Sequence, residues 1–244
     1  METTQNQTKT LGKQWSRQRI LKKQDIPTPQ SIIYTCQQFP ELYQQALFAI
    51  TYLTGGRISE VVKCKHLRKN IYKRELRKDK FGVERYFVIR NEHKTPAIER
   101  VEIVKDEKGN TQNYPGILKR DITFGNIQDK AIMTINMQNR KNKQFIRKSI
   151  PITIEKESEM VKIIQDYLAT LPTPETPLFN FTTRKAEYIM ERTQYNPHFL
   201  RDIRLTHMVT IYNFNAFQLA KFAGWKDIKP AERYVRLGIG DIVY

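Results

Sequence analysis

The spacing of apolar residues predicts two helices near the start of the chain, joined by a tight turn. The first helix has its apolar residues near one face, at Leu42, Leu47, Ile50 and Leu53. The pair Gly55-Gly56 ends this helix, and Ser59 begins a shorter one. The pattern therefore places Arg57 at a turn between two helices.

A β-rich segment follows, from about residue 70 to residue 152. Runs of β-branched and aromatic residues alternate there with charged turns that contain glycine or asparagine, which is typical of antiparallel strands. The clearest runs are 85–90, 101–104, 131–135 and 149–152. These runs predict the sheet of the protein.

Helical spacing returns in the last third of the chain. The first helix there carries apolar residues at Val161, Ile164, Leu168 and Leu171. Beyond a proline-rich break at 172–177, we expect further helices at about 184–193, 198–213, 216–224 and 230–236. The whole pattern predicts an α+β protein, mostly α-helical, with a small antiparallel β-sheet.

The N-terminal region differs from the rest of the chain. Residues 1–30 are polar and basic, and Pro27 and Pro29 disfavour a helix at their end. We expect a tail there and a domain over residues 31–244. A chain of 244 residues with 39% hydrophobic content can bury one good core and a small second unit.

The net charge of the chain indicates the class of molecule that it binds. The chain has 42 Lys and Arg against 25 Asp and Glu, a net charge of +17. Such an excess favours a nucleic-acid partner, although a basic surface also serves solubility or an anionic membrane. No apolar run approaches the roughly 18 residues that span a bilayer, and the N-terminus lacks the apolar centre of a signal peptide. We expect a cytoplasmic protein without a membrane partner.

Cysteine and histidine are too sparse to suggest a metal or a disulfide framework. Cys36 and Cys64 are isolated, and no Cys/His cluster has zinc-site spacing. The four histidines are His66, His93, His198 and His207. We therefore expect chemistry that requires no metal.

Three short motifs and a late tyrosine occur in a set order. Gly55-Gly56-Arg57-Ile58-Ser59-Glu60 comes first, His198-Phe199-Leu200-Arg201 follows, and Gly224-Trp225 precedes Tyr234, which stands nine residues after Trp225. Each motif alone is common. Their order and distances together resemble the dispersed active site of the tyrosine recombinases, the phage-integrase family. The resemblance covers about residues 35–244, the length of that family's catalytic domain.

The resemblance implies a phosphate clamp. Metal-free cleavage of a DNA phosphodiester requires cations on the nonbridging oxygens, a nucleophile, and an acid for the leaving oxygen. By resemblance, Arg57 and Arg201 hold the phosphate, because a planar guanidinium binds two oxygens and keeps its charge. Glu60, one helical turn from Arg57, orients or buffers that charge.

The resemblance also assigns the nucleophile and its neighbours. It makes Tyr234 the nucleophile and His198 the base that assists it; the alternative for His198 is a helix-capping residue after Pro197. Trp225 stands where many members have histidine. An indole donates one hydrogen bond and can pack against the tyrosine helix, but it cannot transfer a proton. The alternative for Trp225 is an ordinary core residue.

The family's remaining catalytic group is a lysine on a β-hairpin. The order of strands around Lys141 favours that residue, with Lys143 beside it, whereas Lys94 on an earlier candidate hairpin is the rival. If the later hairpin is the family's, the β-rich segment at about 66–115 is an insertion into the catalytic domain.

Two features depart from the family pattern. Arg201 is followed by Asp202-Ile203, where members usually have Arg-His-Thr. Members generally also carry an N-terminal helical domain of about a hundred residues, which is the usual size of a separate domain. Only some 30 to 40 residues precede the first arginine-bearing segment, so we expect a minimal member or a truncated product.

The resemblance implies a site-specific DNA recombinase, or integrase, that cleaves and rejoins double-stranded DNA through a 3′-phosphotyrosyl intermediate. It also implies a prokaryotic or viral protein, and no cofactor, because the energy of the broken bond is retained. Expected partners are double-stranded DNA and further copies of the chain, as a dimer or tetramer on paired sites. A type IB topoisomerase remains an alternative because it shares these catalytic groups. A second alternative is a recombinase-derived DNA-binding protein that no longer cleaves DNA.

Overall fold

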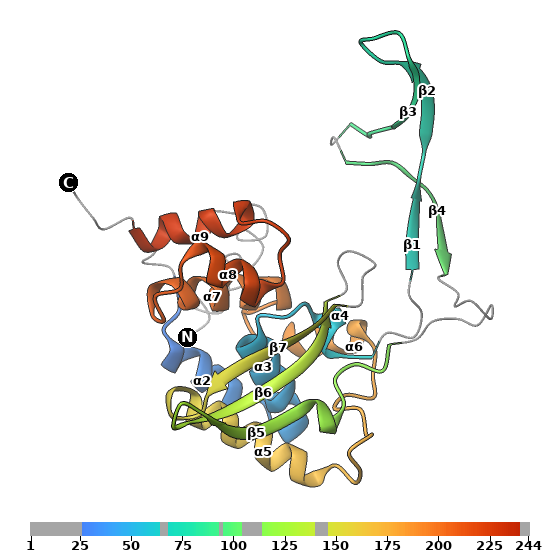
Figure 1. Cartoon of the computed structure of the whole chain (residues 1–244). Coiled ribbons are helices and arrows are strands. Elements are labelled where there is room, and N and C mark those ends of the chain that lie inside the picture. Colours follow the sequence, from blue (N-terminus) through green and yellow to red (C-terminus); the bar gives the residue numbers. More distant parts are fainter. Residues whose placement is uncertain (1–25, 64–67, 93–94, 104–113, 140–145, 240–244) are drawn as a thin grey trace, which may run out of the picture. The chain divides into compact units, whose positions relative to one another are not determined.

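The computed structural model describes residues 26–63, 68–92, 95–103, 114–139 and 146–239. The chain divides into two compact units, labelled by element in Figure 1. The first unit comprises the chain up to Lys63 and again from Pro115 onward, and the second comprises Cys64–Tyr114. Each unit is described by itself below.

The first unit is built around the buried helix α3, Leu42–Thr54, which lies against α2, Pro29–Gln37. Gly55 ends α3 in a left-handed conformation, with φ 51°, as the glycine pair predicts. The expectation that Pro29 disfavours a helix is wrong. Pro29 occupies the first turn of α2, where a backbone N–H has no intrahelical partner to lose, and Thr28 caps the helix.

A three-stranded antiparallel sheet packs against this helical core. Its strands are β5, Ile122–Ile127, β6, Lys130–Asn139, and β7, Ile146–Thr153, in the order β5-β6-β7. Met133 pairs with Ile152 and Ile135 with Ile150, so alternate residues of β6 and β7 line one buried face. The short η2, Lys119–Asp121, precedes β5, and η3, Glu155–Glu157, follows β7.

The remaining helices of the first unit surround two apolar clusters. In chain order they are α4, Ile58–Val61; α5, Ser158–Thr170; α6, Thr183–Met190; α7, Pro197–Thr210; α8, Ala216–Ala223; and α9, Lys229–Ile239. Helix α7 joins the clusters, because Leu200 and Ile203 belong to the main core while Leu205 and Met208 pack with α8 and α9. Residues on α7 are therefore held from both sides.

The second unit is a long two-stranded ribbon. Strand β1, Arg68–Tyr72, pairs with β4, Ile98–Ile103, and β2, Arg74–Lys78, pairs with β3, Glu84–Val88, all antiparallel. Lys73 connects the two pairs, since its N–H donates to the carbonyl of Ala97 and its carbonyl accepts from the N–H of Ile89. Large apolar side chains such as those of Leu76 and Tyr86 are exposed.

These elements confirm the mixed α+β class with small antiparallel sheets that the sequence predicts. The second unit covers nearly the same residues as the β-rich segment expected at about 66–115. Its status as an insertion into a recombinase domain stays a prediction. Within the described residues, none of the helices has the length and apolar character that crossing a membrane requires.

Candidate active site

Arg57 is fixed at the turn between α3 and α4. It is the N-cap residue of α4, and Glu60 on that helix accepts hydrogen bonds from both the backbone N–H of Arg57, at 3.0 Å, and its Nη1, at 3.1 Å. The Glu60 side chain is fully buried, whereas that of Arg57 is 24% exposed. Glu60 therefore holds a guanidinium that solvent can still reach.

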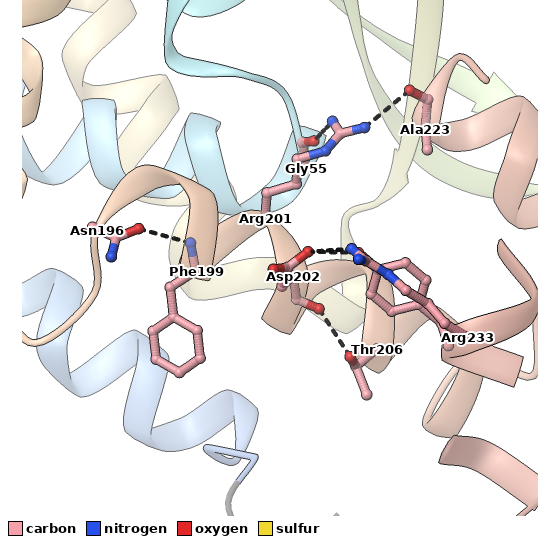
Figure 2. A network of polar contacts seen from close by, with 9 residues as sticks. Gly55, Asn196, Phe199, Arg201, Asp202, Thr206, Ala223 and Arg233 are labelled. Atoms are coloured by element: carbon pink, nitrogen blue, oxygen red, sulfur yellow. Dashed lines mark hydrogen bonds and ion pairs between the residues drawn. The ribbon is translucent and has the colours of Figure 1, made fainter. Parts of the chain in front are cut away.

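Arg201 joins the ends of two helices from its position on α7. Its Nη1 donates to the carbonyl of Gly55, just past the end of α3, and its Nη2 donates to the carbonyl of Ala223 at the end of α8, at 3.2 Å (Figure 2). The guanidinium carbon lies 5.8 Å from the centre of the Trp225 ring. Arg201 thus connects the segment before Arg57 with the segment before Trp225.

The charges that shift the pKa of Arg201 come from the same part of the molecule. Burial lowers the pKa of Arg201 most, and the positive charge of Arg57 lowers it further, while Glu60, Tyr234 and Asp202 raise it. Two guanidinium groups that repel each other in this way favour an anion bound beside them, because the anion relieves the repulsion. The charges of Arg57 and Arg201 therefore lie close enough to repel each other.

Trp225 and Tyr234 form a stacked pair. Helix α8 ends at Gly224, which has φ 69°, and the chain then turns through Trp225 toward α9. The two ring centroids are 5.8 Å apart with an interplanar angle of 20°. Tyr234 is only 2% exposed. The indole therefore packs against the tyrosine helix, as the sequence interpretation of Trp225 anticipates.

The Tyr234 hydroxyl is engaged by a residue that the sequence interpretation leaves without a role. It donates to Oδ1 of Asp202 on α7, at 2.5 Å. Nη2 of Arg233 donates to the same carboxylate oxygen, at 3.0 Å, and also to the Tyr234 hydroxyl. Burial raises the pKa of Tyr234 most, and the Asp202 charge adds to that rise, whereas Arg233 opposes it. The phenol is protonated in this arrangement.

His198 lies in the first turn of α7 with an exposed side chain. The capping role that was its alternative belongs to Asn196, whose side-chain oxygen accepts from the N–H of Phe199 at 2.9 Å (Figure 2). Among the described residues, the hydrogen bonds of the Tyr234 hydroxyl are made with Asp202 and Arg233. His198 shares a helix with Arg201 but does not share the burial of Arg201.

The candidate lysines lie outside the described residues. Strands β6 and β7 form the expected hairpin, paired as far as Asn139 and Ile146, and Lys141 and Lys143 belong to the segment between those two residues. Lys94 likewise falls in a segment that the structure leaves out. The choice among the three lysines therefore stays a prediction.

A buried charged cluster supports α7 from the side of the main core. Arg204 Nη1 donates to Glu157 Oε1 at 2.5 Å, with both side chains almost fully buried. His207 is also buried; its Nδ1 lies 2.7 Å from the Tyr52 hydroxyl and its Nε2 lies 2.8 Å from the carbonyl oxygen of Pro27. These contacts hold the helix that carries Arg201 and Asp202.

In the described part of the chain, no group of three or more His, Cys, Asp or Glu side chains is placed to hold a metal ion. Cys36 is a buried free thiol, and burial raises its pKa to about 12, so it is not a ready nucleophile.

No protein-family model, no curated protein and no solved structure gives a significant match to this chain.

Proposed function

We propose that this protein breaks and rejoins double-stranded DNA as a tyrosine-type site-specific recombinase. The observation that carries the proposal is the position of Arg201. Its guanidinium bonds to Gly55, two residues before Arg57, and to Ala223, two residues before Trp225, whose ring stacks on Tyr234. One buried arginine thus links segments that lie far apart in the sequence.

The proposed chemistry begins with a DNA phosphate held by Arg57 and Arg201, which neutralise the charge that develops on its nonbridging oxygens. Tyr234 attacks the phosphorus, a 3′-phosphotyrosyl bond forms, and the 5′ oxygen leaves as a hydroxyl. A 5′ hydroxyl from a second strand then reverses the step. Because the phosphodiester energy is retained in the phosphotyrosyl bond, the cycle requires no nucleotide cofactor.

The proposed reaction also requires two groups that transfer protons. The leaving 5′ oxygen requires an acid, for which Lys141 is the candidate, with Lys143 beside it and Lys94 as its rival. The phenol requires a proton acceptor, and the candidates on α7 are His198 and Asp202. The proposed partners are double-stranded DNA, favoured by the net charge of +17, and further copies of the chain on paired sites.

A recombinase-derived DNA-binding protein without cleavage activity is the second candidate. The observation that favours it is the burial of Tyr234, whose hydroxyl is already bonded to Asp202. A nucleophile must reach the phosphorus, so this candidate predicts DNA binding without a covalent product. A type IB topoisomerase shares the cleavage step and differs in relaxing a single supercoiled plasmid without paired sites.

Covalent trapping separates these candidates. Purified protein is incubated with a pool of nicked random-sequence duplexes, in which cleavage beside the nick releases a short strand and prevents rejoining. The proposal predicts DNA that stays bound to wild-type protein in denaturant and is enriched in one sequence, whereas Tyr234→Phe binds the pool but gives no such complex. Binding without any covalent complex from wild type would favour the second candidate. Plasmid relaxation by single copies would favour the topoisomerase.

A further inference from the structure

The attack of a tyrosine on phosphorus requires an acceptor for the phenol proton. An unperturbed tyrosine has a pKa near 10, so little phenolate is present at neutral pH. An acceptor acts within hydrogen-bond distance of the hydroxyl, at about 2.6–3.2 Å between heavy atoms or through one water. The acceptor must therefore be one of the groups that lie within this distance of the Tyr234 hydroxyl.

Among the residues that the structure describes, three elements packed against Tyr234 present different groups to it. Helix α7 presents Asp202 and the nearby charge of Arg201, α9 presents Arg233, and the turn after α8 presents the Trp225 ring. Arginine and tryptophan side chains only donate hydrogen bonds, whereas a carboxylate only accepts them. Of these groups, Asp202 is the one that can receive a proton, and it already accepts the hydroxyl hydrogen bond at 2.5 Å.

Arg233 favours the same transfer. Its guanidinium donates to Asp202 Oδ1 at 3.0 Å and contacts the Tyr234 hydroxyl as well, and its carbon lies 4.5 Å from the centre of the Tyr234 ring. A positive charge beside the hydroxyl stabilises the negative charge that grows on the phenol oxygen as the proton leaves. Asp202 and Arg233 thus act on one oxygen, the first as acceptor and the second as counter-charge.

We propose that Asp202, and not His198, accepts the proton of Tyr234 when it attacks DNA; this inference rests on the proposed function. As the Tyr234 O–H bond breaks, the proton passes to Asp202 Oδ1 and the phenol oxygen forms a bond to phosphorus. The bond from phosphorus to the 5′ oxygen breaks, and that oxygen takes its proton from the lysine acid. In the reverse step Asp202 returns the proton to Tyr234. In this proposal Asp202, which stands where the family usually has another residue, takes the proton-accepting role.

The test measures the rate of covalent complex formation on a sequence that wild-type protein cleaves, with the nucleotide mapped to Tyr234. Asp202→Asn keeps the size of the side chain but removes the proton acceptor, so we expect a loss of about 100-fold or more at pH 7 with DNA binding retained. Asp202→Glu restores a carboxylate and should recover part of the rate. His198→Gln should lose less than Asp202→Asn. Asp166→Asn on α5, which removes an exposed charge bonded to Lys162, is the matched control.

Two readouts separate proton transfer from a merely structural role. With Asp202→Asn, hydroxide must remove the phenol proton, so the logarithm of the rate should rise by about one for each pH unit above 7, more steeply than in wild type. A fluorinated tyrosine at position 234, which ionises more readily, should restore Asp202→Asn selectively. Replacing the 5′ bridging oxygen of the DNA by sulfur should not restore it, because sulfur removes the need for an acid and not for an acceptor.

The outcomes are distinguishable. If wild type forms no covalent complex, the proposed function fails and this inference falls with it. If wild type reacts at Tyr234 and Asp202→Asn reacts as fast or faster, Asp202 is not the acceptor although the proposed function stands. A larger loss and a steeper pH dependence in His198→Gln would assign the role to His198. Where Asp202→Asn folds poorly, failure of the fluorinated tyrosine to raise its rate per folded molecule would also overturn the inference.

Discussion

The two units of this chain bury their side chains to opposite degrees. In the first unit α3 is enclosed by α2, α5, α6 and α7, and Phe48, Ile50 and Leu53 are completely buried. In the second unit every residue of β3 is exposed, including Tyr86 and Phe87. Stability in the first unit comes from apolar burial, whereas the ribbon depends on its backbone hydrogen bonds. An isolated two-stranded ribbon is marginal in water.

The charged side chains differ in the same way. Glu157 and Arg204 in the first unit are paired where water is excluded. In the second unit Arg100 pairs with Glu102 with 65% and 40% of the two side chains exposed. Exposed pairs contribute little because water screens them, whereas a buried pair is costly to break since it leaves one charge without a partner. The pair that supports α7, Glu157 and Arg204, is of the buried kind, whereas Arg233 and Asp202 in the candidate site are 48% and 40% exposed.

The largest expected effect comes from breaking the buried pair. Glu157→Ala leaves Arg204 buried without its counter-charge and should lower the free energy of unfolding by about 3–5 kcal/mol. The matched change in the ribbon, Glu102→Ala, should lower it by less than about 1 kcal/mol. Urea unfolding followed by circular dichroism measures both. Equal losses in the two variants would mean that the two units do not differ in how they use charge.

A smaller loss of stability is expected when the pH is lowered. Burial lowers the pKa of His207 to about 4, helped by the Arg204 charge and opposed by Pro27 and Glu157. The unfolded chain therefore binds the proton near pH 6.5 and the folded chain only near pH 4. Stability from this group is complete above pH 6.5 and falls as the pH drops from 6.5 to 4, by an amount on the order of 2 kcal/mol.

This pH dependence is measured as the difference between wild type and His207→Gln in urea unfolding at several pH values. Subtraction removes the carboxylate titrations that the two proteins share. The difference in unfolding free energy should shrink steadily between pH 6.5 and pH 4. A difference that stays constant over that interval would show that His207 is not held neutral by the fold.

The smallest effect on the first unit is expected from removing the second. The chain leaves and re-enters the first unit at adjacent points, because Ile117 N–H donates to the Val61 carbonyl at 3.2 Å and a Cβ on Gly116 would lie 3.0 Å from the Lys63 nitrogen. A short Gly-Ser linker in place of residues 64–113, which keeps the buried Tyr114, should therefore change the unfolding free energy of the first unit by about 0.5 kcal/mol or less. Loss of cooperative unfolding would show that the first unit depends on the ribbon.

Much of the first unit could be predicted from the sequence because its apolar spacing decides what is buried. The end of α3 at Gly55 and the helices that carry Arg201 and Tyr234 follow from that spacing and from glycine positions. The start of α2 at Pro29 did not follow, since a proline suits both a loop and the first turn of a helix. The exposure of the ribbon did not follow either, because alternation predicts strands without saying what covers them.

Part of the candidate site could also be predicted from the sequence, and part could not. The motif order suggests that Arg57, Arg201 and Trp225 share a site with Tyr234, and the structure places contacts among their segments. The link from Tyr234 to Asp202 was missed because it joins residues 32 positions apart on different helices. A signal was present, since Asp202 follows one predicted site residue and Arg233 precedes another. Tertiary packing alone shows that these neighbours meet.

Whether the protein is a tyrosine recombinase is decided by the identity of the residue that becomes linked to DNA. The trapped covalent complex is digested with nuclease and protease, and the peptide that retains a nucleotide is sequenced by mass spectrometry. We expect a phosphotyrosyl bond at Tyr234, through the 3′ phosphate of the DNA, with the link absent from Tyr234→Phe. A nucleotide on any other residue, or a 5′-phosphate link, would contradict it.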